Sequence, residues 1–471
     1  MYGFAKFFSV SLLTLFPVLS ALATEPAVPG FADLHNHMMA EFGYGGAWFH
    51  GHASGPEEVA MKSCDGNMTL TPDHARTKIS LINELLGQTA GSSGDTGFHA
   101  GKKGGYPNYE GWPRWDTIAH QQMWEGHLKK AHSEGLTLMI MSAVNFKPMC
   151  LLMPERNKEY SCEDMEAVAL QISEFKKFVN TRDWLEIASS PGQAREIISR
   201  GKLAVLLSVE VTDLFPSGDW HSQLKELYLK GVRSIQVVHQ YNSRFAGAAT
   251  HNKIFRVLAS VGPALGVPGA HFDLNEEEHN LLGLTDEGKV LVDEMMGMGM
   301  LIDLAHLSEK GISDVAEISR RHDGYPLMVS HGHFRDIMSG LFNHYEKSSP
   351  GWVIELVRST GGIFGLRTGA EATKAFGTVP NDCAGSSKSF AQAYEYGSLK
   401  YKLPIAFGTD LNGFIQQMRP RFGNNQETCG AEKNKTLRLQ QIKLQSSKSG
   451  ESFDQSGFGH IGQIGSIVRE L

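Results

Sequence analysis

The sequence predicts an α/β fold in which eight parallel strands and their helices close a (β/α)8 TIM barrel. Two observations favour it: short apolar runs alternate with helical segments along most of the chain, and the runs are apolar at nearly every position. A strand that is apolar throughout is buried on both faces, as in a parallel sheet. Eight such units argue for a closed barrel over an open sheet. A single barrel with insertions accounts for the 471 residues.

The strands are expected where the apolar runs lie, at residues 31–37, 136–143, 203–210, 234–239, 300–306, 326–331, 362–366 and 404–410. Amphipathic segments predict helices between them, at 117–133, 165–181, 191–200, 224–230, 285–298, 312–321 and 352–359. Gly201 and Gly231 supply stop signals, and Asp286 and Glu287 place carboxylates in a first helical turn, where the helix dipole favours them. A further helix is expected to start near residue 461.

A long stretch rich in glycine and proline separates the first two strands. Residues 38–115 read as a loop insertion over the mouth of the barrel, with one helix at 72–86. The pair His50 and His52 within it lacks a strand, so a loop role is expected for both.

The N-terminus has the features of a secretory signal. Lys6 precedes an apolar run at 7–22, and Ala21-Leu22-Ala23 offers a small-x-small cleavage site. We therefore expect residues 1–23 to be a signal peptide and 24–471 to form one domain, exported to the periplasm or secreted. An uncleaved signal anchor is the alternative. No later apolar run is long enough to span a bilayer.

The cysteines and the net charge limit the kinds of site and partner that the chain can have. Export permits disulfides, and Cys150 with Cys162, and Cys383 with Cys429, are the expected pairs. No Cys-x-x-Cys pair is present, which argues against a thiolate zinc site. The net charge of −7 gives no basic surface for nucleic acid.

Ionisable side chains close six of the eight predicted strands. His35 and His37 lie two apart at the end of the first strand, so they point the same way, about 7 Å apart along the backbone. A polar side chain is destabilising at the end of a buried strand unless it has a partner. In barrels of this kind the chemistry gathers at the carboxyl ends of the strands. The other members are Glu210, His239, His306, His331 and Asp410.

Coordination chemistry predicts a role for each of these residues. We expect two divalent metal ions, with Glu210 as the bridging carboxylate. The imidazole ligands favour Zn²⁺ as the metal. His35 and His37 would hold one ion, and His306 and His331 the other. Asp410 would contact a metal and act as general base. A metal-bound hydroxide would then attack an amide or ester carbonyl.

Several segments resemble the amidohydrolase superfamily, and more narrowly the renal (membrane) dipeptidase family. The resemblance covers about residues 203–413. Its most specific part is the block from Gly283-Leu-Thr-Asp-Glu-Gly288 to Gly299-Met-Leu-Ile-Asp-Leu-Ala-His306. It is also carried by the segments 231–242, Ser330-His331 and Phe407-Gly-Thr-Asp-Leu-Asn-Gly413.

The resemblance implies a dipeptidase-like hydrolase with a small dipeptide or amide substrate, and a homodimer. It implies that Glu210 bridges the metals, that His239 contacts the substrate and that Arg335 binds the substrate carboxylate. The chain departs from the family at His35-Asn36-His37, where the family has His-x-Asp. His-x-His is common in the wider superfamily, so metal binding is still expected.

Two other functions fit the same barrel. One is another amidohydrolase, such as a one-metal deaminase, a lactonase or an amidase. The other is a catalytically silent exported binding protein. Glu210 favours the two-metal hydrolase, because a one-metal site needs no bridging carboxylate. Asp410 favours an enzyme, because a pure binding protein has no use for a base there.

Overall fold

The structure is a computed structural model that describes residues 28–46, 49–63, 105–109, 112–151, 156–251, 256, 260, 262–267, 270–378, 380–421 and 457–470. The predicted signal peptide, the predicted helix at 72–86 and Cys429 lie outside these residues, so they stay predictions. Among the described residues, no helix is long and apolar enough to cross a membrane.

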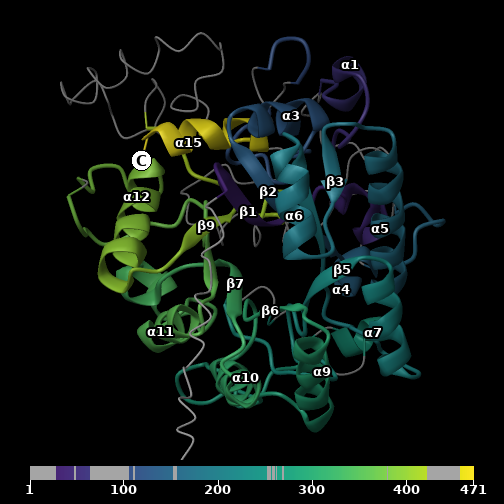
Figure 1. Ribbon diagram of the computed structural model, residues 1–471, viewed down its shortest axis with the longest axis vertical. Helices are drawn as coiled ribbons and strands as arrows, with labels where there is room; N and C mark the ends of the chain where they lie inside the picture. The colour runs from purple at the N-terminus through teal and green to yellow at the C-terminus, as the bar shows by residue number, and fades with distance from the viewer. Residues whose placement is uncertain are drawn as a thin grey trace, which may run out of the picture.

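Eight parallel strands close a barrel, as predicted (Figure 1). The barrel closes because β2 pairs with β4 as well as with β1, in register over seven residues from Leu138 opposite Ala204 to Val144 opposite Glu210. The strands are β1 (Phe31–Asn36), β2 (Leu136–Val144), β4 (Leu203–Glu210), β5 (Val232–Gln236), β6 (Leu301–Asp303), β7 (Leu327–Gly332), β8 (Ile363–Arg367) and β9 (Ile405–Gly408).

A ninth strand, β3 (Leu185–Ile187), was not predicted. It pairs with the first residues of β4, and β5 pairs with the later residues of β4. The two strands therefore follow one another along the same edge of β4. Three residues are too short to give a periodic signal, which is why the sequence pattern did not show it.

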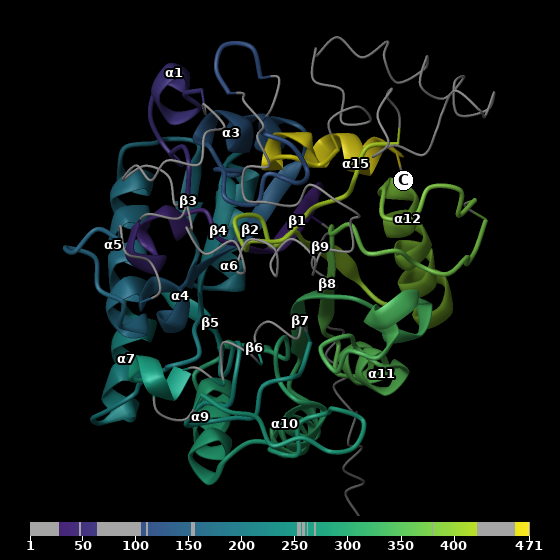
Figure 2. The same cartoon turned by 180° about the vertical axis from the view of Figure 1, so that it is seen from behind.

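Helices surround the barrel and cover its outer face (Figures 1 and 2). They are α3 (Glu125–Ser133), α5 (Asp164–Asn180), α6 (Pro191–Ser199), α7 (Trp220–Leu229), α9 (Asp286–Gly297), α10 (Glu309–Arg321), α11 (Gly351–Ser359), α12 (Ser387–Glu395) and α15 (Ile464–Glu470), with short α1 (Glu57–Ala60) and α4 (Lys147–Leu151). Helix α12 was missed by the sequence pattern, and the helix expected at 117–133 begins only at Glu125.

Helix starts agree with the capping signals. The hydroxyl of Thr285 accepts a hydrogen bond from the backbone N–H of Gly288 at 3.0 Å, and Asp286 and Glu287 occupy the first turn of α9. The hydroxyl of Ser308 caps α10 in the same way, from Gly311. Each cap satisfies a backbone donor that the helix itself leaves unpaired.

Apolar side chains fill the barrel. A cluster drawn from most of its strands occupies the interior, with Leu34, Ile140 and Met328 buried and Leu138, Leu206, Leu301, Ile363 and Ala406 packed against them. The larger core lies between strands and helices, where Phe175 of α5 is fully buried. The barrel is therefore a packed scaffold that holds the strand ends rigidly.

Cys150 and Cys162 form the predicted disulfide, which closes the loop between α4 and α5. Within the insertion, His50 binds the backbone carbonyl of Lys62 through Nε2 at 2.8 Å, and His52 pairs with Glu41 at 2.8 Å. Both histidines thus have the loop roles expected of them.

Asp164, the first residue of α5, makes the stability of the fold depend on pH. Its carboxylate accepts hydrogen bonds from Nδ2 of Asn145 and from the backbone N–H of Asp213, at 2.8 Å each. Burial outweighs these bonds and raises the pKa of Asp164 from 3.8 to about 7. The folded state therefore holds this proton more tightly than the unfolded chain does.

The stability contributed by protonated Asp164 is complete below about pH 4 and is lost as the pH rises to about 7, by at most ~1.4 kcal/mol per pH unit. Asp164→Asn removes this titration. Urea unfolding at pH 4.5 and 7.5 should show that the wild type loses more free energy of unfolding over this interval than the variant. Equal losses in the two proteins would contradict the prediction.

Candidate metal centre

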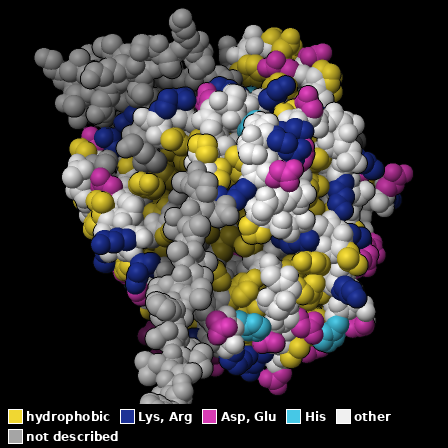
Figure 3. All heavy atoms as spheres, in the orientation of Figure 1, with side chains coloured by type: hydrophobic (Ala, Val, Ile, Leu, Met, Phe, Trp, Pro, Cys, Tyr) yellow, Lys and Arg dark blue, Asp and Glu magenta, His cyan; other side chains and the backbone are white. Residues whose placement is uncertain are grey.

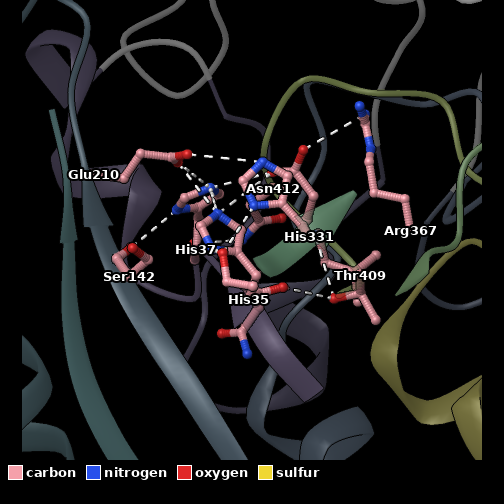
Figure 4. Close-up of polar contacts among 12 residues, drawn as sticks. His35, His37, Ser142, Glu210, His331, Arg367, Thr409 and Asn412 are labelled. Carbon is pink, nitrogen blue, oxygen red and sulfur yellow. Dashed lines mark hydrogen bonds and ion pairs between the residues drawn. The ribbon is translucent and has the colours of Figure 1, made fainter. Parts of the chain in front are cut away.

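All seven of the predicted strand-end residues gather at one end of the barrel, and all are buried. His35 lies within β1 and His37 directly follows it, while Glu210 is the last residue of β4 (Figure 4). His331 lies within β7; His239, His306 and Asp410 come from the loops after β5, β6 and β9.

One half of the centre contains His35, His37 and Asp410. Nε2 of His35 lies 3.1 Å from Nε2 of His37, so the two imidazoles converge as the strand spacing predicted. Both nitrogens approach Oε2 of Glu210, at 3.2 and 3.0 Å respectively. Oδ1 of Asp410 lies 3.2 Å from Nε2 of His37.

The other half contains His306 and His331, whose Nε2 atoms are 3.0 Å apart. They face the other oxygen of Glu210: Oε1 lies 3.2 Å from Nε2 of His306 and 3.9 Å from Nε2 of His331. His239 stands beside them, with Nε2 3.7 Å from the same oxygen. Glu210 thus presents one oxygen to each half.

These distances fit divalent metal ions. Ligand atoms around a tetrahedral Zn²⁺ lie roughly 3.3 Å apart, given bonds of about 2.0–2.1 Å. Oε1 of Glu210 is buried without a hydrogen-bond donor, which costs free energy unless a cation offsets it. Three sets of buried ligand atoms, each within 4.8 Å of one another, could hold an ion: His35, Glu210 and His331; His35, His37 and Asp410; Glu210, His239 and His306.

The far sides of the imidazoles fix their tautomers. Nδ1 of His37 lies 2.9 Å from the backbone carbonyl of Ser142 (Figure 4). Nδ1 of His306 lies 3.1 Å from the backbone carbonyl of His239. A carbonyl only accepts, so each Nδ1 carries the proton and each Nε2 keeps its lone pair toward the centre. Metal-binding histidines are commonly oriented in this way.

Ser330 is the hydrogen-bond partner of the other two histidines, His35 and His331. Its hydroxyl lies 3.2 Å from Nδ1 of His35 and 3.1 Å from Nδ1 of His331, and so contacts one ligand from each half. Nε2 of Gln236 donates to the same hydroxyl at 3.3 Å.

Ser330→Ala should weaken metal binding about 10- to 100-fold, because it removes the partner of both imidazole N–H groups without touching a ligand. Competition with a metal chelator of known affinity measures the effect. Ser359→Ala on the exposed end of α11 is the control. An affinity within twofold of the wild type would show that Ser330 does not orient the histidines.

Both carboxylates of the centre are ionised. Burial alone would raise the pKa of Asp410, but its contact with His37 and the charge of Arg367 outweigh burial and lower that pKa. Burial of Glu210 is likewise outweighed, by His239, His35 and His306, so the pKa of Glu210 falls well below its usual range. Ionised carboxylates are the form in which these residues bind metal.

Two residues of the centre have strained backbones. His306 has φ of +64° and Asp410 has φ of +52°, in the left-handed region that side chains with a Cβ rarely adopt. Such strain persists only where the surrounding structure imposes it, and it is common at functional sites.

A cavity of about 120 Å³ opens onto the centre. Tyr44 from the insertion contributes to its wall, so part of the predicted loop excursion does reach the mouth of the barrel. The sequence did not point to Lys347, Arg367 or Glu371, which line the cavity together with His333. An NH2 nitrogen of Arg367 lies 3.5 Å from Oδ2 of Asp410 (Figure 4).

Arg335 does not line this cavity. Its guanidinium donates to Oε1 of Glu309 at 2.7 Å and to the backbone carbonyls of Ser348 and Glu346 at 2.9 Å each. These bonds hold the loop after β7 in place, and the arrangement does not support the substrate contact predicted for Arg335.

Comparisons with known proteins find a family and relatives that resemble this chain. The model of the membrane dipeptidase family, peptidase family M19, matches residues 127–265 and 269–374, which include Glu210, His239, His306 and His331. Dipeptidase verJ of Clonostachys rogersoniana is 26% identical over 39% of this chain, and mouse Dipeptidase 3 is 28% identical over 43%. The matched segments span 38% and 34% of the lengths of these two relatives.

Two solved structures are also similar. One is a metallopeptidase from Rhodobacter sphaeroides liganded with a phosphinate mimic of L-Ala-D-Ala, at 15% identity and a TM-score of 0.44, covering 74% of this chain and 90% of that one. The other is the probable dipeptidase PvdM from Pseudomonas aeruginosa, at 16% identity and a TM-score of 0.46, covering 73% and 89%.

His35, His37 and Asp410 lie outside the residues that the family model matches, yet the barrel brings them close to Glu210, His239, His306 and His331, which lie within those residues. The family model matches more than half of the chain, and the chain therefore belongs to the membrane dipeptidase family, peptidase family M19.

Proposed function

We propose that this protein is a dipeptidase that hydrolyses the peptide bond of a small dipeptide with two divalent metal ions, zinc in the native protein. The observation that carries the proposal is Glu210, which turns one oxygen toward His35 and His37 and the other toward His306. A carboxylate so placed between two groups of histidines suits a pair of metal ions.

The chain's own residues supply the remaining chemistry. His35, His37 and Asp410 would hold one ion and His306 and His331 the other, with Glu210 shared. Metal ions held by these residues would polarise a carbonyl and lower the pKa of water. Asp410 is ionised and can accept a proton from the attacking water. His239 lies at the cavity wall, where it can contact the substrate.

The size of the cavity limits the substrate. At about 120 Å³ it is smaller than the 300–1,000 Å³ typical of sites for drug-sized ligands. It therefore suits a dipeptide better than a longer peptide. The relatives named dipeptidases support the same substrate class.

The test combines metal analysis with a substrate panel. Purified protein should contain about two zinc ions per chain, hydrolyse dipeptides and lose activity to a chelator, with recovery on adding Zn²⁺. Tripeptides and a lactone are the control substrates. Metal-free protein without turnover, or a preference for the lactone, would overturn the proposal.

We also propose that the protein is exported and forms a homodimer. The basic, apolar and small-x-small pattern of residues 1–23 supports export. Sequencing the N-terminus of the mature protein should find Thr24 first, and light scattering should give twice the chain mass. An intact Met1 or a monomeric mass would contradict the respective part.

A further inference from the structure

The wall of the cavity beside the metal centre has a charged side and an apolar side. Among the described residues, the charged side chains outside the centre are Lys347, Arg367 and Glu371, which lie at the end of β8 or follow β7 and β8. Apolar side chains line the side formed by β2, β1 and β9, three neighbouring strands of the barrel. They are Tyr44 after β1, Val144 at the end of β2, Phe146 and Met149 after β2, and Phe414 and Ile415 after β9. These six residues are called the apolar sector below.

The polar groups on the same side are few. Of the described residues there, they are His37 and Asp410 of the metal centre, the hydroxyl of Tyr44 and the amide of Gln416. On the outer surface, by contrast, Lys and Arg side chains are interspersed with Asp and Glu (Figure 3). The separation of apolar from charged groups is therefore a feature of the cavity.

Packing holds the apolar sector in shape. The ring of Phe414 lies between two rings of the insertion, with its centroid 5.0 Å from that of Tyr44 and 4.8 Å from that of Phe49. Phe146 is buried, and its ring centroid lies 5.8 Å from that of Tyr241. Aromatic pairs at such separations are favourable. The rings thus present a fixed apolar surface to the cavity.

The disulfide loop after α4 fixes Tyr44. The backbone N–H of Tyr44 donates to Oδ1 of Asn145 at 2.8 Å, and Nδ2 of Asn145 donates to the carbonyl of Cys162 at 3.0 Å. The next carbonyl, of Gly45, accepts from the backbone N–H of Asn157 at 2.8 Å. Tyr44 has φ of +52°, and these bonds maintain that strained conformation.

We propose that the apolar sector binds an apolar side chain of the substrate, so that the enzyme prefers dipeptides with leucine over dipeptides with a polar residue of the same size. The proposal rests on the proposed function, because it presupposes dipeptide hydrolysis, and it narrows the substrate class. Tyr44 and Phe414 lie outside the residues that the family model matches. The preference is therefore assigned to loops of this chain and not to the family as a whole.

Two effects favour leucine over asparagine, whose side chain has nearly the same shape. A leucine side chain that leaves water for the apolar sector gains free energy in proportion to the area it buries. The amide of asparagine loses its hydrogen bonds to water there and finds few partners on this wall. Together these effects predict a kcat/KM about 10²-fold higher for the leucine dipeptide.

Steady-state kinetics of the metal-loaded protein on Leu-Gly, Asn-Gly, Gly-Leu and Gly-Asn test the proposal. One of the two leucine dipeptides should exceed its asparagine counterpart about 10²-fold in kcat/KM. Phe414→Asn should reduce this ratio about tenfold or more, because it removes an apolar ring. Phe414 has φ of +57°, which Asn tolerates. Met149→Gln, which keeps the length of the side chain, should reduce the ratio as well.

A binding measurement separates recognition from catalysis. Calorimetry with a phosphinate analogue of the preferred leucine dipeptide should give a negative heat-capacity change, because binding buries apolar surface. The change should be smaller in magnitude in Phe414→Asn. Tyr394→Asn on the exposed face of α12 removes a ring that does not line the cavity, and it should leave every ratio unchanged. Circular dichroism verifies that each variant is folded.

A wild type that hydrolyses leucine and asparagine dipeptides equally well, or prefers asparagine, would overturn the inference. So would variants that lower kcat/KM equally for both, because the apolar sector would then support the site without binding the side chain. If no dipeptide is hydrolysed, the proposed function itself fails. If dipeptides are hydrolysed whatever their side chains, the proposed function stands and only the role of the apolar sector is rejected.

Discussion

Glu210→Gln should abolish most of the activity and remove at least one metal ion per chain. The substitution keeps the shape of the side chain but removes its charge and replaces one oxygen with an amide NH2, which is not a metal ligand. The half of the centre that faces the NH2 loses its contact with a carboxylate oxygen. In the wild type, the two oxygens of Glu210 lie 3.0–3.2 Å from the Nε2 atoms of three histidines.

The expected fall in kcat/KM is about 10³-fold or more, equivalent to ~4 kcal/mol of transition-state stabilisation. This exceeds the 10- to 100-fold typical of residues that only support a ligand. Steady-state kinetics on the best dipeptide and metal analysis of the same sample measure both effects.

Glu355→Gln is the matched control, since Glu355 is half exposed on α11 and pairs with Arg358 in the same helix. It should keep full activity and metal content. A Glu210→Gln protein that still holds two ions and loses less than tenfold in kcat/KM would show that Glu210 does not bridge the centre.

The strand ends were predictable because a closed parallel barrel leaves little freedom there. Once the apolar runs of β1, β4 and β7 are placed, His35, Glu210 and His331 must emerge at one end of the barrel. The two-residue spacing of His35 and His37 then fixes which face they share. Long-range geometry thus followed from local pattern for these residues.

The same reasoning about strand ends could have predicted Arg367. It is the last residue of β8, whose apolar run was taken to end one residue earlier, at Leu366. Extending that strand by one residue would have added a cation at the strand end beside Asp410. The boundary of a strand is the part of its pattern that apolar periodicity defines least well.

Lys347 and Arg335 show what the sequence could not supply. Both belong to the loop region after β7, whose path depends on contacts such as that of Arg335 with Glu309 on α10. Arg335 was expected at the substrate because it closely follows His331, but the chain turns its guanidinium to backbone carbonyls of the loop. Lys347 lies much farther along the chain and reaches His306. Spacing along an irregular loop does not determine direction.

Asp410→Asn should lower kcat about 10³-fold while changing KM little. The carboxylate lies 3.2 Å from Nε2 of His37 and is held ionised, so it can accept a proton during the reaction. An amide cannot, and general-base catalysis by a placed side chain typically contributes 10²–10⁴-fold. Asn keeps an oxygen that can contact the metal, so most of the metal should remain.

Asn is the informative substitution because Asp410 has φ of +52°. Asn tolerates this left-handed backbone, whereas Ala would add strain and confuse loss of the base with loss of the loop's conformation. Asp323→Asn is the matched control, because Asp323 is exposed between α10 and β7 and has φ of +56°. If Asp410→Asn retains more than a tenth of the wild-type kcat while the control is unaffected, the proton must be accepted by another group in the cavity, and Asp410 would be reduced to a metal ligand.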